Sequence, residues 1–249
     1  MLAVYPAAAR VLPIDYQDAG VAPPADASLP LPVSVTDSSG RHISLGDLIS
    51  HPTVLVFADY TCRTLCGPTI AFVASALEKS GLRPSDQFQL LVIGLDPKDS
   101  MADAATMRHA HIGAGTPLDR ATEFVTASPA AVQKLTTALG YRYHYDADSD
   151  VYIHPAAAYV LRSDGHVSRV LTGIGLSGAD MRLAIVEASA GKVGTLRDQV
   201  RLLCSAFDPA HGTYDLRISR ILEFAAFVTV ALLAGGIGLL LFADRRRAA

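Results

Sequence analysis

TVLVFADYTCRTLCGP, residues 53–68, is the stretch that decides the fold and the chemistry expected of this chain. Its first six residues form a continuous apolar run rich in β-branched side chains, which predicts a strand buried on both faces. Cys62 and Cys66 follow directly, and from Pro68 onward apolar residues recur at helical spacing until Gly81. The stretch therefore predicts a strand, a cysteine-bearing loop and a helix in immediate succession.

The segments around this stretch continue the alternation of strands and helices. Upstream, Pro32–Leu45 alternates around Ser-Ser-Gly and predicts a hairpin. Further strands are predicted at 88–95, 122–125, 157–162 and 167–172. Helices are predicted through His111 with Asp99 or Ser100 as the cap, from 129 onward, at 177–190 with Ser177 and Asp180 as a capping box, and at 195–207. This order predicts an α/β protein with a parallel or mixed sheet covered on both faces, and the closing hairpin and helix are typical of a thioredoxin-like fold.

The chain is expected to divide into five parts. They are an extended N-terminal arm (1–29), a thioredoxin-like domain that includes the N-terminal hairpin extension (30–192), an amphipathic connector (193–222), a transmembrane helix (223–243) and a basic cytoplasmic tail (244–249).

The membrane segment is predicted from Phe224–Phe242, which reads FAAFVTVALLAGGIGLLLF and carries no charge over 19 residues. At about 1.5 Å per residue it nearly spans a hydrocarbon core of roughly 30 Å, and a buried core helix is the alternative. The arginines at 245–247 predict a cytoplasmic C-terminus and a single-pass protein of the cell membrane with its main domain on the periplasmic side, although Arg217 and Arg220 lie on the other flank. Because residues 1–13 lack the basic start of a signal peptide, we expect export to depend on an upstream start or on this segment acting as a reverse signal-anchor.

Composition narrows the function further. The net charge is −3, from 21 Lys and Arg against 24 Asp and Glu, and no basic cluster with interleaved aromatics suggests a nucleic-acid partner. Three cysteines are too few for a disulfide scaffold. No phosphate-binding glycine loop, Ser-His-Asp order or paired carboxylate pattern is evident. The close cysteine pair therefore points to redox or metal chemistry.

The placement of Cys62 and Cys66 suits both kinds of chemistry. Backbone N–H groups at a helix start stabilise a thiolate, and Arg63 adds a nearby positive charge. The CxxxC spacing gives the sulfurs freedom to bracket a metal. Two thiolates suit Cu(I), an added imidazole would also accommodate Cu(II), and zinc would usually want a fourth ligand. Two buried, inert cysteines are the alternative.

The chain resembles the SCO1/SenC proteins, the thioredoxin-fold copper chaperones of cytochrome c oxidase assembly, over roughly residues 30–190. The resemblance is carried by the VFADYTC approach, CxxxC, the LVIGLDPKDS stretch and a distal histidine just before a strand. A C-terminally membrane-anchored subgroup is more similar still. It shares the stretches GYRY at 140–143, SR at 168–169, LAIVEA at 183–188, LC at 203–204 and FDP at 207–209.

The resemblance implies that Cys62, Cys66 and His154 are copper ligands, with Cu(I) or Cu(II) as the metal, and that Asp96 shapes the site from a neighbouring loop. It implies a membrane-anchored copper-binding protein that delivers copper to, or matures, the copper site of a respiratory cytochrome oxidase. An oxidase subunit or another copper acceptor would be the partner. Arg63 and Gly67 depart from the family pattern, in which proline usually follows the first cysteine and often follows the second. So does Pro155, which replaces a small polar residue after the histidine.

Two other functions remain open from the sequence. With Cys62 and Cys66 as catalytic residues, the protein would be a thiol-disulfide oxidoreductase that keeps partner cysteines reduced without stable metal binding. With a vestigial site, it would be a membrane-anchored interaction domain. Among the remaining candidates, His109 and His111 diverge on a predicted helix and are expected to be solvated surface groups. Cys204 and His211 lie near the predicted membrane segment, where a packing role is expected for Cys204 and a second metal or redox contact is the alternative.

Overall fold

The computed structural model describes residues 19–62, 66–147, 150–173, 176–208, 213–216, 226–227, 229–230 and 232–236. Within these ranges the side chains at 66, 203, 204, 206, 215 and 216 are not described. Arg63, His211, Arg217, Arg220 and the tail at 244–249 lie outside the described residues, as do most of the predicted arm and of the predicted membrane segment.

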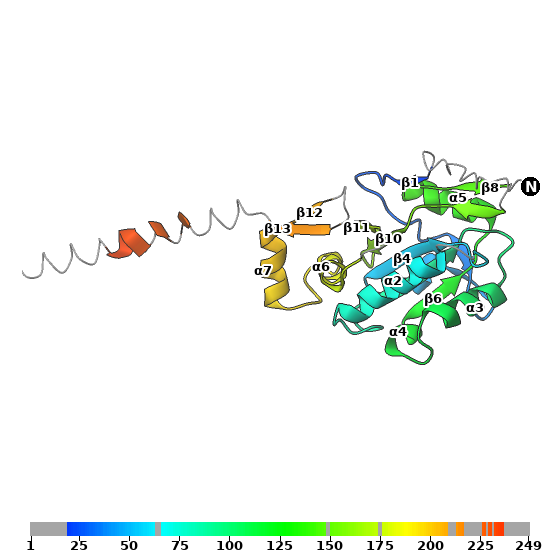
Figure 1. Cartoon of the computed structure of the whole chain (residues 1–249), viewed down its shortest axis with the longest axis horizontal. Coiled ribbons are helices and arrows are strands. Elements are labelled where there is room, and N and C mark those ends of the chain that lie inside the picture. Colours follow the sequence, from blue (N-terminus) through cyan, green and yellow to red (C-terminus); the bar gives the residue numbers. More distant parts are fainter. Residues whose placement is uncertain are drawn as a thin grey trace, which may run out of the picture.

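Five strands form the central sheet, in the order β11-β10-β4-β5-β6 (Figure 1). They are β4 (Thr53–Ala58), β5 (Gln89–Gly94), β6 (Thr122–Val125), β10 (Ala157–Leu161) and β11 (Val167–Thr172). β4, β5 and β6 run parallel, whereas β10 is antiparallel to β4 and β11 to β10. All six residues of β4 are buried. The predicted mixed sheet is confirmed, and its most apolar strand lies at the centre.

Helices cover both faces of this sheet. One face packs against α2 (Cys66–Lys79), α3 (Met101–His111) and α6 (Gly178–Ala188), and the other packs against α5 (Pro129–Ala138). Because side chains alternate along a strand, Val54 and Val56 join the first layer, whereas Leu55 and Phe57 join the second. Burial on both faces explains why the strand reads as one apolar run rather than an alternating pattern.

Short polar side chains set the helix starts where the sequence predicted them. Ser100 accepts a hydrogen bond from the backbone N–H of Asp103, whose side chain accepts one in return from the backbone of Ser100. Ser128 caps α5 with proline as the first helical residue, and Ser177 caps α6. These caps satisfy backbone donors that the first turn of a helix leaves unpaired.

The second face also carries the N-terminal extension. The predicted hairpin is confirmed as β2 (Ser34–Thr36) and β3 (His42–Ser44), followed by the short α1 (Leu45–Leu48). The sequence did not predict the other small elements beside this extension or between β5 and β6. These are the pairing of β1 (Gly20–Val21) with β7 (Tyr141–Arg142), the hairpin of β8 (His144–Asp146) and β9 (Val151–Ile153), and α4 (Pro117–Arg120).

The chain leaves the domain through α7 (Leu196–Cys204) and a hairpin of β12 (Ser205–Asp208) and β13 (Thr213–Leu216). The helix predicted at 195–207 therefore ends at Cys204, and the chain continues directly into β12. The sequence did not predict the β12–β13 hairpin. Arg182 of α6 holds α7 through two hydrogen bonds of 2.7 Å to the carboxylate of Asp198.

In the part of the chain that the structure describes, no helix is long and apolar enough to cross a membrane. The described residues between 226 and 236 are helical, and Phe227 and Leu232 expose about seven-tenths of their surface.

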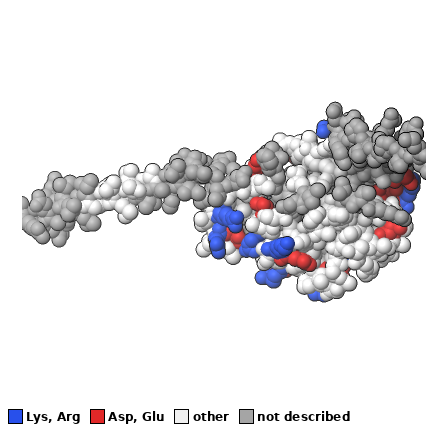
Figure 2. All heavy atoms as spheres, in the orientation of Figure 1, with Lys and Arg blue, Asp and Glu red and all other residues white. Residues whose placement is uncertain are grey.

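Charged side chains are mixed on the surface. On the face in Figure 2, the coloured Lys and Arg side chains are interspersed with Asp and Glu rather than gathered into one patch. Among the residues drawn in colour on this face, no extended basic surface of the kind that binds nucleic acid is visible.

Candidate metal centre

The cysteine loop leaves the sheet at the C-terminal end of β4 and is anchored there by Tyr60. The buried Tyr60 hydroxyl lies 2.9 Å from the carbonyl oxygen of Val92 in β5 and 2.7 Å from that of Val125 in β6. Its backbone N–H donates to Asp99 Oδ2 at 2.7 Å. The anchor spans three parallel strands, so it fixes the root of the loop relative to the sheet.

Cys62 and Cys66 are placed as the sequence predicted, between this strand and a helix. Cys62 is partly buried, packs against the first core layer, and its N–H donates to the carbonyl of Asp59 at 3.3 Å. Cys66 is the first residue of α2, and its side chain lies outside the described atoms. A helix start is the position at which backbone N–H groups favour a thiolate.

His154 is brought to the same end of the sheet by the antiparallel pairing of β10 with β4. Ala158 lies opposite Val56, so the residues just before β10 stand beside the end of β4, where the cysteine loop begins. The charges of Cys62 and Asp59 both act on the His154 imidazole. The structure thus brings Cys62 and His154 within electrostatic range, although they lie 92 positions apart in the chain.

Hydrogen bonds fix the orientation of the imidazole. Nδ1 of His154 lies 2.9 Å from the Tyr141 hydroxyl and 3.2 Å from the carbonyl oxygen of Pro155. The hydroxyl itself donates to that carbonyl at 3.0 Å. Because the hydroxyl donates its only proton to the carbonyl, it must accept the hydrogen bond that it shares with His154. The ring proton of His154 is therefore on Nδ1. Nε2 then carries the lone pair and is the nitrogen suited to coordinate a metal.

The protonation state of His154 also suits a ligand. Burial lowers the pKa of the imidazole, against the opposing effects of the Pro155 hydrogen bond and of the negative charges of Cys62 and Asp59. A lowered pKa keeps the ring neutral at physiological pH, and only the neutral ring has a lone pair for a metal.

Tyr141 contacts the candidate ligand His154, a role that the sequence did not reveal. It belongs to the GYRY stretch that carries part of the family resemblance, but it reads as an ordinary aromatic before a turn. Its ring packs 4.7 Å from that of Phe57, centroid to centroid, and so holds the hydroxyl under His154. The only available signal was a tyrosine 13 residues before the candidate ligand, which spacing alone does not interpret.

Asp96 lies on the neighbouring loop after β5, as the resemblance implied. It stands in a group with Asp59 and Asp99, in which one oxygen of each lies within 4.8 Å of the others. Asp59 also accepts hydrogen bonds from the backbone N–H and hydroxyl of Thr61, both at 3.0 Å. No described contact joins Asp96 directly to Cys62 or His154.

His111 departs from its expected role as a solvated group. It ends α3 half-buried, and an ideal Cβ on Gly67 would lie 2.2 Å from its Nε2. Its imidazole therefore lies against the first turn of α2, next to Cys66 in the chain. His109 is exposed, as predicted.

Comparison with known families fits this arrangement of fold and side chains. A model of the SCO1/SenC family matches residues 23–188, which is more than half of the chain. The chain belongs to the SCO1/SenC family. The sequence matches none of the curated proteins with which it was compared.

Solved structures agree with the fold of this SCO1/SenC protein. A protein from Aquifex aeolicus VF5 is 21% identical, with 67% of this chain and 95% of that chain covered and a TM-score of 0.60. BsSco, a member of the Sco family of cytochrome c oxidase assembly proteins in which a disulfide switch was identified, is 19% identical, with coverages of 71% and 99% and a TM-score of 0.53. ScoI of Bradyrhizobium japonicum, solved with copper bound, is 20% identical, with coverages of 62% and 95% and a TM-score of 0.50. The predicted thioredoxin-like α/β fold is confirmed.

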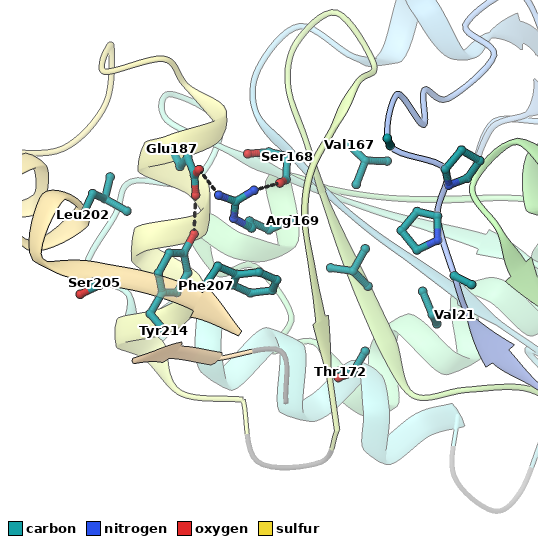
Figure 3. Close-up of a pocket in the computed structure, with 15 residues that line it drawn as sticks. Val21, Val167, Ser168, Arg169, Thr172, Glu187, Leu202, Ser205, Phe207 and Tyr214 are labelled. Atoms are coloured by element: carbon teal, nitrogen blue, oxygen red, sulfur yellow. Dashed lines mark hydrogen bonds and ion pairs between the residues drawn. The ribbon is translucent and has the colours of Figure 1, made fainter. Parts of the chain in front are cut away.

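A large groove of this SCO1/SenC protein lies elsewhere, along the edge strand β11. It encloses about 860 Å³ between that strand, the residues after β1 and the β12–β13 hairpin (Figure 3). Its polar centre is partly paired, since Glu187 binds Arg169 and accepts from the Tyr214 hydroxyl at 2.6 Å, whereas the buried Arg169 Nε has no hydrogen-bond partner among the described residues. None of the candidate ligands lines it. Geometry and chemistry therefore favour the smaller convergence at Cys62 and His154 as the functional site.

Proposed function

We propose that this protein binds copper through Cys62, Cys66 and His154 and delivers it to, or matures, the copper site of a respiratory cytochrome oxidase. The observation that carries the proposal is the orientation of His154. Its Nδ1 is hydrogen-bonded to Tyr141 and Pro155, which leaves Nε2 to coordinate the metal. The charge of Cys62 acts on the same ring.

The donor set fits copper better than other common metals. Thiolates are soft ligands that select Cu(I), and an imidazole nitrogen extends the set to Cu(II). A structural zinc site would usually take a fourth protein ligand. Membership of the SCO1/SenC family supports the same choice, as does the copper in ScoI of Bradyrhizobium japonicum.

Copper is the cargo in this proposal rather than a resident cofactor. Thiolates exchange metal by forming bonds to an incoming ligand before the old bonds break, and a partly exposed loop gives a partner access. Only reduced, deprotonated cysteines bind, so the redox state of Cys62 and Cys66 would control loading.

We further propose that the protein is anchored by a single transmembrane helix at 223–243, with the copper site on the periplasmic side. The uncharged run at 224–242 and the arginines at 245–247 support this orientation. An oxidase subunit or another copper acceptor would then meet the site outside the cytoplasm. Labelling of intact cells with a membrane-impermeant thiol reagent tests the orientation. Labelling of Cys62 is expected, and labelling only after lysis contradicts it.

The copper proposal is tested by titrating the reduced full chain in detergent with Cu(I) against a chromophoric competitor. One copper per chain is expected, with binding weakened at least about tenfold in His154→Ala and abolished in Cys62→Ser. His109→Ala is the matched control, because this exposed imidazole lies on α3 and should leave the affinity unchanged. Equal affinity of wild type and His154→Ala would remove the imidazole from the site.

A thiol-disulfide oxidoreductase is the second candidate, favoured by the position of Cys66 at the start of α2. One cysteine thiolate would attack a partner disulfide and form a mixed disulfide. The other would displace the partner thiolate, leaving an oxidised Cys62–Cys66 pair and a partner reduced by two electrons. Reduction of one partner disulfide per reduced chain, lost in Cys62→Ser but kept in His154→Ala, would favour this candidate over copper delivery.

A further inference from the structure

Three carboxylates converge at the C-terminal edge of the parallel strands, beside the root of the cysteine loop. Asp59 follows β4 directly, and Asp96 and Asp99 lie between β5 and α3. Since β4 and β5 run parallel, their C-terminal ends meet at one edge of the sheet. One oxygen from each side chain lies within 4.8 Å of the other two. Asp59 and Asp99 expose only 2% and 7% of their surface, whereas Asp96 is partly exposed.

One oxygen in this group has no donor. Asp99 Oδ2 accepts the backbone N–H of Tyr60 at 2.7 Å. Oδ1 of the same side chain is buried and accepts no hydrogen bond from any described residue. A buried carboxylate oxygen without a donor is costly, because water can no longer solvate it. This orphaned oxygen in a nine-tenths-buried side chain points to a ligand that the protein itself does not supply.

The described residues also provide no positive charge for the group. None of the three carboxylates forms an ion pair with a described Lys or Arg. Lys98 lies between two of them in the chain, but its Nζ is 3.0 Å from Asp150 Oδ1 and 5.3 Å above the ring of Tyr145. The one nearby cation of the described loop is thus directed to the β8–β9 hairpin.

We propose that Asp59, Asp96 and Asp99 bind a hard divalent cation of the size of Ca²⁺, at a site separate from the two thiolates and the imidazole. Carboxylate oxygens are the ligands that Ca²⁺ prefers, at about 2.4 Å, so oxygens on opposite sides of the ion stand about 4.8 Å apart. The three oxygens, all within 4.8 Å of one another, satisfy this limit. Mg²⁺ is usually held by one or two carboxylates and keeps several waters, so three converging carboxylates favour Ca²⁺. Water would fill the remaining positions, reached through the exposed side of Asp96.

The electrostatics of Asp99 agree with this assignment. Burial raises the pKa of Asp99 to about 7, opposed by the Tyr60 N–H and reinforced by the charges of Asp59, Asp96 and Asp103. A cation removes the repulsion among these carboxylates and replaces the missing donor at Oδ1. It also joins the root of the cysteine loop to the loop before α3, because Asp59 and Tyr60 belong to the first and Asp96 and Asp99 to the second.

The experiment uses the full chain in detergent, stripped with a chelator and titrated with Ca²⁺ at pH 8 by calorimetry. We expect one saturable Ca²⁺ per chain and a thermal midpoint that rises with Ca²⁺ concentration. Asp99→Asn and Asp96→Asn should each weaken binding at least about tenfold. Asp47→Asn, an exposed acid on α1, should have no effect. The double variant Cys62→Ser, Cys66→Ser should keep Ca²⁺ binding while losing copper.

Three results would overturn the site. They are the absence of saturable binding by wild type, wild-type affinity in folded Asp99→Asn or Asp96→Asn, and loss of Ca²⁺ in the cysteine double variant. If Asp99→Asn does not fold, Asp96→Asn decides alone. Failure of the copper proposal would instead appear in the copper titration and leave these Ca²⁺ results unchanged.

Discussion

Replacement of Tyr141 by phenylalanine isolates the contact that orients His154, the imidazole proposed as a copper ligand. The change removes a hydroxyl that lies 2.9 Å from His154 Nδ1 and 3.0 Å from the Pro155 carbonyl oxygen. Phenylalanine keeps the ring against Phe57 at 4.7 Å and against Tyr159 at 6.2 Å. Without the hydroxyl, the Nδ1 proton retains the longer contact to the carbonyl, at 3.2 Å.

The expected loss of copper affinity follows from that single contact. A neutral hydrogen bond contributes about 1 kcal/mol, and removal of the partner that orients a metal-binding histidine typically weakens metal binding about 10- to 100-fold. We expect the lower end, about tenfold or 1.4 kcal/mol, because the Pro155 carbonyl still favours the same tautomer. Stability should fall by about 1 kcal/mol for the lost hydrogen bond.

The assay is the anaerobic competition for Cu(I), with urea unfolding measured in parallel. Tyr159→Phe is the matched control. It removes a buried hydroxyl that donates to the Leu139 carbonyl at 3.0 Å on the same face of the sheet, and it has no contact with His154 among the described interactions. The control should lose similar stability and keep its copper affinity. If Tyr141→Phe binds copper as tightly as the control does, the hydroxyl does not orient the ligand and the reasoning fails.

The remaining predictions concern stability, measured by urea unfolding. Asp198→Asn should lower the free energy of unfolding by about 2 kcal/mol at pH 7, because it breaks the two hydrogen bonds from Arg182. Since that pairing lowers the pKa of Asp198, the stability difference between wild type and variant should shrink only below about pH 4. Gly140→Ala should lower the free energy of unfolding by about 3 kcal/mol, because φ is +61° and a Cβ there would lie 2.1 Å from a backbone oxygen. Gly40→Ala, where φ is +78° but the space is open, should lower it by only about 1 kcal/mol. In chelator, the stability advantage of Asp99→Asn over wild type should grow by up to about 4 kcal/mol as the pH rises from 4 to 7. Across this range the unfolded wild type has already ionised Asp99, whereas the raised pKa of about 7 keeps the folded state protonated, so wild-type stability falls; a difference that does not change with pH would contradict this.

The fold was predictable where a local pattern corresponds to one structure. The apolar run of β4 and the hydroxyl caps of α3 and α6 are read within a few residues, and the structure places these elements at those positions. The β12–β13 hairpin was not predictable in this way. Its first strand continues the amphipathic pattern of α7 without an intervening break, and its stability depends on contacts with α6, such as that between Tyr214 and Glu187.

The site was predictable only in part for a related reason. The spacing of Cys62 and Cys66 identifies them as candidates, whereas His154 was assigned by family resemblance rather than by any local signal. Tyr141 and Asp99 act through partners far along the chain, so their roles depend on how β10 and β5 pair with β4. A single sequence contains these residues but not the distances between them.

Gly67 and His111 show how a departure from the family pattern acquires a physical reason once the coordinates are known. Gly67 departs from the pattern expected from the resemblance, in which proline often follows the second cysteine, and proline is acceptable in the first turn of a helix. Here the space of a Cβ at position 67 is taken by the His111 imidazole, whose Nε2 would lie 2.2 Å away. Glycine at the start of α2 and histidine at the end of α3 are therefore two halves of one packing arrangement. A change at either position should be judged together with the other, and the altered residue after Cys66 does not by itself argue against a working metal centre.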